Sequence, residues 1–344
     1  MVKYTIKRIL LAFITIFIIL SLTFILMKLL PFSKPAGMPD AMMAYYENQV
    51  HLGYVTSSET ELTGYGEILW QFKDSRGIYT YYYETPVMTQ YFAFIGNVFT
   101  KWDWGTSTYI KPNYSAIGII GERLPLSMSL NIISVLISVP LGILLGIWAA
   151  LKKNTLTDHI ISTLVMVFIS IPSFVIITFL ISGFGYNLHW LPTQWPGENA
   201  TIDQQVLGYV IPVMALSFGS VCGYCRFTRA ELCEVMSSEY LLLARTKGLT
   251  RRQAIIRHAL RNAMVPIVPS ILAEFIGILG GSMILENLYG IPGIGSLYIR
   301  ALNAKDYNVL MVDMALFTSI SLIAGVFLDL SYGFIDPRIR MGAR

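Results

Sequence analysis

Charged side chains are scarce in this sequence. Asp, Glu, Lys and Arg make up 13% of its 344 residues, whereas a soluble domain carries about 25%. Apolar residues make up 54% of the chain. This balance excludes an ordinary soluble domain and indicates a polytopic membrane protein.

Cysteine is also scarce. The three cysteines, Cys222, Cys225 and Cys233, lie near the end of one apolar segment, which excludes a disulfide framework. The Cys222-x-x-Cys225 spacing fits a redox or metal pair, but small apolar filling residues are the favoured interpretation. We therefore expect no metal site.

Sequence motifs for catalysis and nucleotide binding are missing as well. No G-x-x-x-x-G-K-[ST] phosphate loop occurs, so the chain is not expected to hold ATP or another cofactor by itself. Gly290, Gly293 and Gly295 fit a tight external turn better than a phosphate cradle. His258 has no carboxylate or nucleophile spaced to work with it, and we expect a transport subunit rather than an enzyme.

Long apolar runs are what the chain has instead. Six of them, each near the ~20 residues that cross a bilayer, cover residues 9–30, 124–151, 160–184, 206–224, 265–285 and 309–330. They predict an all-α integral membrane fold with six transmembrane helices. The first run is too long for an ordinary signal peptide and lacks an A-x-A cleavage site, so we interpret it as a retained helix.

The cations indicate the orientation. With the N-terminus inside, the cytoplasmic segments hold most of the Lys and Arg residues, which is the positive-inside pattern. The short external loops between the later spans then hold only Arg300 and Lys305. Both termini are therefore expected in the cytoplasm.

Four regions follow from this reading. Residues 1–30 form the N-terminal transmembrane helix, and 31–121 an extracytoplasmic segment with an interfacial aromatic helix near 88–101. A small packed external subdomain is the alternative for that segment, which includes the aromatic cluster of Tyr79 and Tyr81–Tyr83. Residues 122–333 form a core of five helices, and 334–344 a cytoplasmic tail.

The stretch 237–266 separates the fourth and fifth apolar runs. Ser237 or Ser238 can cap a first short helix, Gly248 can take a positive φ after it, and Thr250 with Gln253 fits a capping box for a second helix. Burying each of its cations at a bilayer centre would cost about 2.5–3.5 kcal/mol. We therefore predict a helical hairpin in water. Its cations are Arg245, Lys247, Arg251, Arg252, Arg257 and Arg261.

A helical hairpin of this kind can dock on a soluble partner. Ile256, Ala259, Leu260 and Ala263 are spaced to form an apolar stripe flanked by cations, which suits a groove on another protein. A loop that only fixes topology and attracts anionic lipid is the alternative. Nucleic-acid binding is disfavoured because both ends of the hairpin are tethered to the membrane.

The hairpin resembles the EAA motif of membrane subunits of ATP-binding-cassette importers. The resemblance lies in Glu239-Tyr240-x3-Ala244-Arg245-x-Lys247-Gly248 and in Arg257-His258-Ala259-Leu260-Arg261-Asn262-Ala263, and Leu241–Leu243 depart from the motif's alanines. Trp104–Ser107, Glu122–Pro125, Glu286–Gly295 and Ile335–Arg340 also resemble the permeases of dipeptide and oligopeptide importers.

This resemblance implies a type I importer permease in the inner or plasma membrane of a prokaryote. It implies these partners: a second homologous permease, two ATPase subunits that bind ATP and Mg²⁺, an extracytoplasmic solute-binding protein, a peptide substrate and the lipid bilayer. The ATPase-coupling residues would be Glu239, Ala244, Lys247, Gly248, Arg257, His258 and Asn262.

Polar residues within the spans are candidates for the translocation pathway. Glu274 and Asp313 are intramembrane acids, which line pathways or helix interfaces. Asn131, with Ser127 and Ser129, either faces the pathway or joins helices. Three other functions stay open: a permease for nickel or a nickel chelate, an ion-driven secondary transporter, and a membrane scaffold without transport.

Overall fold

The computed structural model describes residues 2–30, 39–62, 68–197, 199–277 and 281–335. The chain divides into two compact units. Unit 1 comprises residues 1–9, 125–296 and 320–344, and unit 2 comprises residues 10–124 and 297–319.

Four helices are long and apolar enough to cross a membrane within the described ranges. They lie in α1 (Val2–Leu29), α4 (Ala116–Leu151), α7 (Ile202–Met236) and α13 (Tyr307–Ile335). A bent pair of helices raises the number of spans to five at most. The predicted count of six is thus not reached by the described residues and stays a prediction.

The third apolar run is not one straight helix. α5 (Leu156–Ile169) is followed by α6 (Ser173–Leu180) and the π-helix η2 (Ile181–Asn187), with a bend of 99° at the break. Pro172 explains the break, because it lacks an N–H donor and disfavours helix in the preceding residue.

The fifth apolar run is shorter and displaced. α10 (Leu260–Gly277) begins inside the predicted hairpin and contains Pro266 and Pro269. Residues 278–280 lie outside the described ranges. The chain continues with α11 (Met283–Tyr289) and α12 (Ile294–Ala304).

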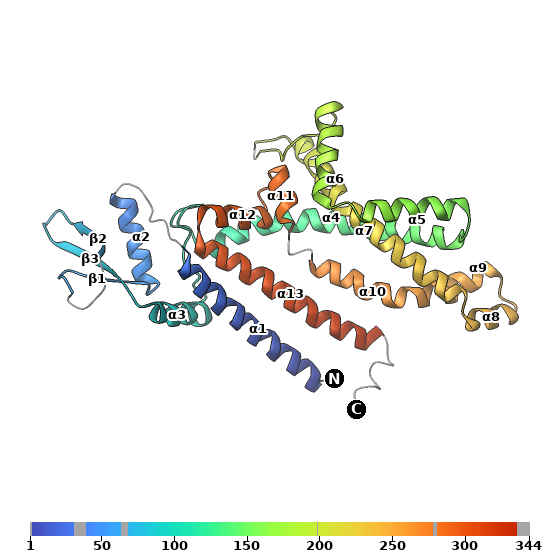
Figure 1. Ribbon diagram of the computed structural model, residues 1–344, viewed down its shortest axis with the longest axis horizontal. Coiled ribbons are helices and arrows are strands. Elements are labelled where there is room, and N and C mark those ends of the chain that lie inside the picture. Colours follow the sequence, from blue (N-terminus) through green and yellow to red (C-terminus); the bar gives the residue numbers. More distant parts are fainter. Residues whose placement is uncertain (1, 31–38, 63–67, 198, 278–280, 336–344) are drawn as a thin grey trace. The chain divides into compact units, whose positions relative to one another are not determined.

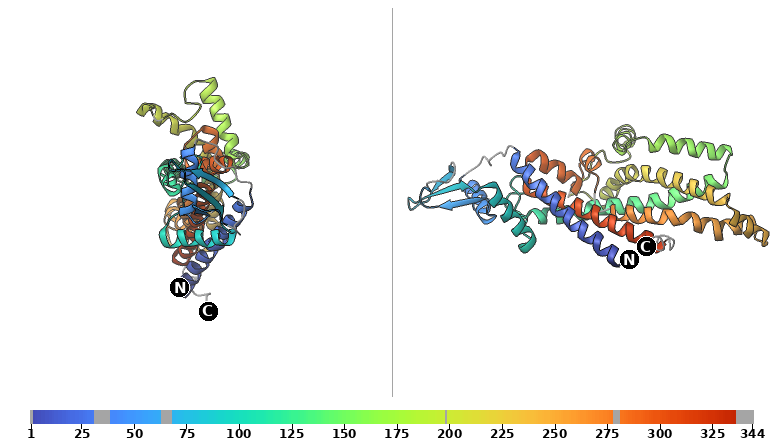
Figure 2. Two further views of the ribbon diagram at one scale, coloured as in Figure 1. Left: turned by 90° about the vertical axis from the view of Figure 1, so that its left-hand side faces the viewer. Right: turned by 60° about the horizontal axis from the view of Figure 1, so that its bottom comes forward.

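Unit 1 is built around α7. Helices α5, α6 and α10 pack against it, and Figure 2 shows these helices from a second direction. Gly142 and Gly146 of α4 allow α4 to approach the α7 backbone, because a Cβ at Gly146 would lie 2.7 Å from the Cys225 carbonyl oxygen. Small residues permit such close packing of membrane helices.

Unit 2 contains a β-sheet, which corrects the all-α prediction. Strands β1 (Val55–Ser58), β2 (Ile68–Lys73) and β3 (Tyr79–Glu84) form an antiparallel sheet in the order β1-β3-β2. The predicted aromatic cluster is the central strand β3, as aromatic residues favour strands. Helix α2 (Pro39–His51) covers the sheet, with Tyr46 stacked on Trp70 and packed on Tyr82.

The predicted interfacial helix corresponds to α3 (Val87–Gly96) and the π-helix η1 (Asn97–Lys101). Its Phe94 is buried against Phe24 of α1 and Trp104. The aromatic segment therefore packs into the core of unit 2. This packing is what the alternative prediction of a small packed subdomain requires. Its place in a membrane interface stays a prediction.

Candidate coupling site

The predicted hairpin is present at the end of α7. It consists of α8 (Glu239–Thr246), a turn, α9 (Arg251–Ala254) and the π-helix η3 (Ile255–Ala259), which continues into α10. Gly248 has a φ of +94°, so its predicted positive φ is confirmed. Gln253 N–H donates to Thr250 Oγ1 at 3.3 Å and Thr250 N–H to Gln253 Oε1 at 3.1 Å, which confirms the capping box.

The prediction that a serine side chain caps α8 is wrong. Ser238 occupies the N-cap position of α8, but it makes no side-chain capping bond. Its hydroxyl donates to the Val235 carbonyl oxygen, at 2.5 Å, and thereby satisfies the end of α7 instead.

The inner face of the hairpin is apolar and closely packed. Ala254, Ala259 and Ala263 are fully buried. With Leu241 and Ile255 they form one cluster that includes Leu232 of α7 and Ala150 of α4. These small side chains hold both short helices against the ends of the long ones.

The predicted apolar stripe is only half right. Ala259 and Ala263 face inward, but 55% of Ile256 is exposed. The reason is η3, since a π-turn adds one residue to a helical turn and rotates the positions around it. Nothing in the apolar spacing indicates that turn.

The outer face carries most of the predicted coupling residues. Glu239, Lys247, Gly248, Arg257, His258 and Asn262 are exposed, whereas Ala244 is buried and packs the inner face. Three apolar residues, Leu242, Leu243 and Ile256, are exposed among these cations. The sequence analysis placed Ile256 in the docking stripe but did not single out Leu242 and Leu243 as exposed. Leu242 and Leu243 stand where the EAA motif has small residues, and that departure was the available signal.

A buried ion pair fixes the helix that leads into the hairpin. Asp158 of α5 is 0% exposed and accepts bonds from Arg229 Nε at 2.6 Å and Nη2 at 2.8 Å. It also accepts the Asn154 N–H at 2.9 Å. This two-point pairing ties the α4–α5 turn to α7. The sequence analysis did not single out either residue.

The three pathway candidates make separate contacts. Glu274 is half-buried and accepts the Ser220 hydroxyl at 2.6 Å. Asn131 Nδ2 donates to the Ser127 carbonyl oxygen at 3.0 Å within α4. Asp313 belongs to unit 2 and is fully buried there.

Glu286 organises a second buried network, which the sequence analysis missed. Its carboxylate accepts the Ser127 hydroxyl at 2.8 Å, the Ser282 N–H at 3.2 Å and the Ser296 N–H at 3.0 Å. Burial raises the pKa of Glu286, and these hydrogen bonds act against that rise. Ser127 of α4 is thus bonded to Glu286 of α11, the kind of contact expected of its predicted role in joining helices.

The glycines that follow Glu286 form a turn, as predicted. Gly290 ends α11 with a φ of +73°. Gly293 lies against the network, because a Cβ there would come 2.3 Å from Ser127 Oγ and 2.4 Å from Glu286 Oε2.

Comparisons with known proteins agree with this architecture. The model of the family "Binding-protein-dependent transport system inner membrane component" matches residues 142–341. The dipeptide transport system permease protein DppB of Lactococcus lactis subsp. cremoris is 35% identical over 99% of this chain and 100% of its own length. The oligopeptide transport system permease protein OppB of Escherichia coli is 32% identical over the same shares.

A solved amino acid ABC transporter is a more distant likeness. It covers 63% of this chain and 94% of its own, with 19% identity and a TM-score of 0.47. The chain belongs to the inner membrane components of binding-protein-dependent transport systems, the membrane-spanning subunits of ABC importers.

Proposed function

We propose that this chain forms half of the translocation pathway of an ATP-driven peptide importer. The peptide class is supported by relatives named for dipeptide and oligopeptide transport along their full length. One structural observation carries the coupling role: a hairpin packed firmly by its apolar inner face presents cations and three exposed apolar side chains on its outer face.

The orientation follows from the cations. The hairpin lies in the cytoplasm with both termini, and the α2–β3 segment of unit 2 lies outside. The outer face of the hairpin docks in a groove on an ATPase subunit. ATP and Mg²⁺ bind to the ATPase pair, a homologous permease supplies the other half of the pathway, and a solute-binding protein delivers the peptide.

Transport proceeds by alternating access between inward-open and outward-open states. ATP binding closes the ATPase pair and moves the hairpin with it. The hairpin is continuous with α7 on one side and with α10 on the other, so both helices follow this motion. The Asp158–Arg229 pair passes the motion on to α5.

The pathway is proposed to run past Glu274 and Asn131 in unit 1 and Asp313 in unit 2. Of these, Glu274 and Asn131 are half-buried, whereas Asp313 is fully buried.

The coupling role is tested by Gly248→Asp in the reconstituted importer. The exposed turn has no atom within 4 Å of a built Cβ, so the variant can still insert and fold. We expect peptide-stimulated ATP hydrolysis and uptake to be lost, while the amount of inserted permease is unchanged. Gly248→Ala is the milder control, which adds the strain of a Cβ at positive φ without a charge. Normal uptake by Gly248→Asp would exclude the coupling role.

The substrate class is tested separately. Uptake of a labelled dipeptide, a labelled tripeptide and ⁶³Ni²⁺ is compared in cells that express the whole transporter. We expect one or both peptides to accumulate in an ATP-dependent manner. Accumulation of nickel without either peptide would replace the peptide proposal with the nickel alternative.

A further inference from the structure

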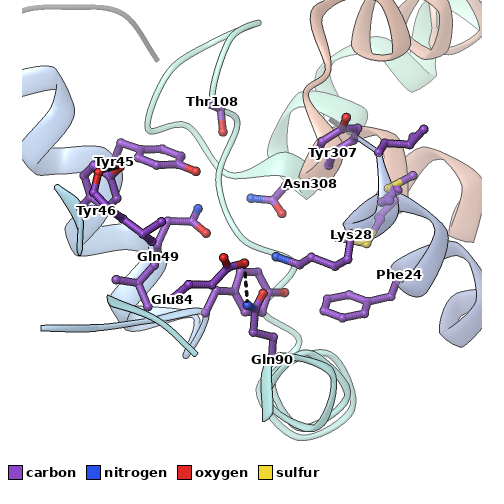
Figure 3. A pocket seen from close by; sticks show the side chains of 16 residues that line it. Phe24, Lys28, Tyr45, Tyr46, Gln49, Glu84, Gln90, Thr108, Tyr307 and Asn308 are labelled. Atoms are coloured by element: carbon purple, nitrogen blue, oxygen red, sulfur yellow. Dashed lines mark hydrogen bonds between the residues drawn. The ribbon is translucent and has the colours of Figure 1, made fainter. Parts of the chain in front are cut away.

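Unit 2 contains a cavity that the coupling mechanism does not use. Its volume is about 280 Å³, near the lower end of the ~300–1,000 Å³ typical of ligand sites. Figure 3 shows its walls, which come from α1, α2, the three strands of the sheet, α3, the loop that contains Thr108 and the start of α13. A cavity of this size suits a small molecule rather than a long peptide.

Two charges of opposite sign line this cavity. Lys28 is the only Lys or Arg and Glu84 the only Asp or Glu among its 16 lining residues. Within the part of the chain that the structure describes, neither of them makes a salt bridge. The cavity is thus neutral overall but has one cationic and one anionic wall.

The ammonium group of Lys28 is held toward the cavity by aromatic rings. Its Nζ lies 4.4 Å from the centre of the Tyr54 ring and 5.6 Å from that of Phe24. Both rings are buried, so the lysine stem cannot swing away freely. Cation–π contacts hold the charge but provide no hydrogen-bond acceptor for its N–H groups.

The carboxylate of Glu84 is also positioned. Gln90 is 1% exposed, and its Nε2 donates to Glu84 Oε1 at 3.3 Å and to the Thr85 carbonyl oxygen at 2.7 Å. The second bond fixes the amide, and the amide in turn orients the carboxylate. Glu84 keeps its other oxygen for a further donor.

The loop that forms the third wall is rigid. Asp306 is fully buried and its Oδ2 accepts the N–H groups of Thr108, Tyr109 and Ile110 at 3.0–3.1 Å. Thr108 of this loop lines the cavity. This wall of the cavity is therefore held in place by its own hydrogen bonds, which lowers the entropic cost of binding there.

We infer that this cavity binds a small zwitterion, a free amino acid or a dipeptide. The ligand carboxylate pairs with Lys28, its ammonium group pairs with Glu84, and the aromatic walls contact its side chain. This inference deepens the proposed function, on which it rests for the outward location of the cavity and for the presence of such ligands. It adds a binding site outside the helices that carry the pathway candidates Glu274 and Asn131.

The test measures binding to the complete importer complex in nanodiscs, without its solute-binding protein. The ligands are alanine, dialanine, N-acetyl-dialanine and dialanine amide. Titration calorimetry measures the dissociation constant of each. We expect dialanine or alanine to bind and both blocked dipeptides to bind about tenfold more weakly, since each loses one charge-assisted pair.

The variants assign each end of the ligand. Lys28→Gln should weaken dialanine binding about tenfold and abolish the preference for dialanine over its amide. Glu84→Gln should also weaken dialanine binding about tenfold, and it should abolish the preference for dialanine over N-acetyl-dialanine. Lys73→Gln is the matched control, because this lysine also lies over a tyrosine ring, Tyr79, but outside the cavity.

The results separate the two proposals. The zwitterion site would be overturned if both variants kept the ligand preferences of the unmodified complex. It would also be overturned if the unmodified complex bound neither dialanine nor alanine, even with normal peptide uptake. Binding with the expected preferences but without peptide uptake would overturn the proposed function instead. If Lys28→Gln does not fold, Thr108→Trp, which fills the cavity from the loop, should abolish binding of all four ligands, and retained binding would count against the site.

Discussion

At the scale of single residues, the buried acids Asp158 and Glu286 of unit 1 are held by close and specific contacts. Glu286 accepts hydrogen bonds from two backbone N–H groups and a serine hydroxyl while only 2% exposed. An acid in such a position costs free energy unless its oxygens are satisfied. Gly293 allows this, because any larger residue would enter the network.

Gly293→Ala should therefore destabilise the protein. The added methyl group would meet Ser127 Oγ at 2.3 Å and Glu286 Oε2 at 2.4 Å, and overpacking of this kind costs about 1–3 kcal/mol. The apparent melting temperature in detergent should fall. Gly219→Ala, where a Cβ meets nothing within 4 Å, is the control, and equal melting temperatures for both variants would contradict the prediction.

The Asp158–Arg229 pair gives a second prediction at this scale. Asp158→Asn should destabilise unit 1 by about 3 kcal/mol, because it leaves a partly buried guanidinium without its counter-charge. This loss lies at the low end of the ~3–5 kcal/mol typical of a broken buried pair, because 32% of the Arg229 side chain is exposed. Thermal unfolding of the purified permease measures the loss. Arg76→Gln removes an exposed pair with Asp74 and should leave stability nearly unchanged.

At the scale of elements, the hairpin shows how one π-turn divides packed from exposed positions. Ala259 and Ala263 pack inward on one side of η3, and Ile256 is turned outward. The two kinds of residue should respond to substitution in different ways.

Ile256→Ala should weaken association with the ATPase subunit without lowering the melting temperature of the permease. Ala259→Leu should instead lower the melting temperature of the permease. Ala259 is fully buried, and overpacking the hairpin with a larger side chain costs about 1–3 kcal/mol of stability. Co-purification of the ATPase and thermal unfolding measure the two effects. Loss of stability in Ile256→Ala would show that the side chain packs within the permease rather than docks.

At the scale of the whole molecule, the cations predict an orientation of the chain in the membrane. A hairpin with six cations and a polar α/β segment should lie on opposite sides of the bilayer. Single cysteines test this directly.

Arg252→Cys should react with a membrane-impermeant maleimide only after the cells are opened, whereas Arg76→Cys should react in intact cells. Cys222 and Cys225 are buried, and Cys233, which is partly exposed, is replaced by serine to remove background labelling. Labelling of Arg252→Cys in intact cells would reverse the orientation and with it the coupling scheme.

The sequence by itself determined the class, the hairpin and its turn. Scarce charge, apolar runs and clustered cations are properties of composition, and the positive φ of Gly248 and the Thr250–Gln253 capping box depend on neighbours within a few residues. Residues close together in the sequence are sufficient to specify such local features, without contacts to the rest of the chain.

Only the tertiary structure decided the remaining features. The tyrosine-rich segment became a β-strand because two other strands and α2 cover it, and η3 turned Ile256 outward. Glu286 with Ser127, Asp158 with Arg229, and Lys28 with Glu84 were assembled from positions between 56 and 159 residues apart. The physical reason is that burial and pairing depend on distance in space, and the spacing of residues along one segment does not encode it.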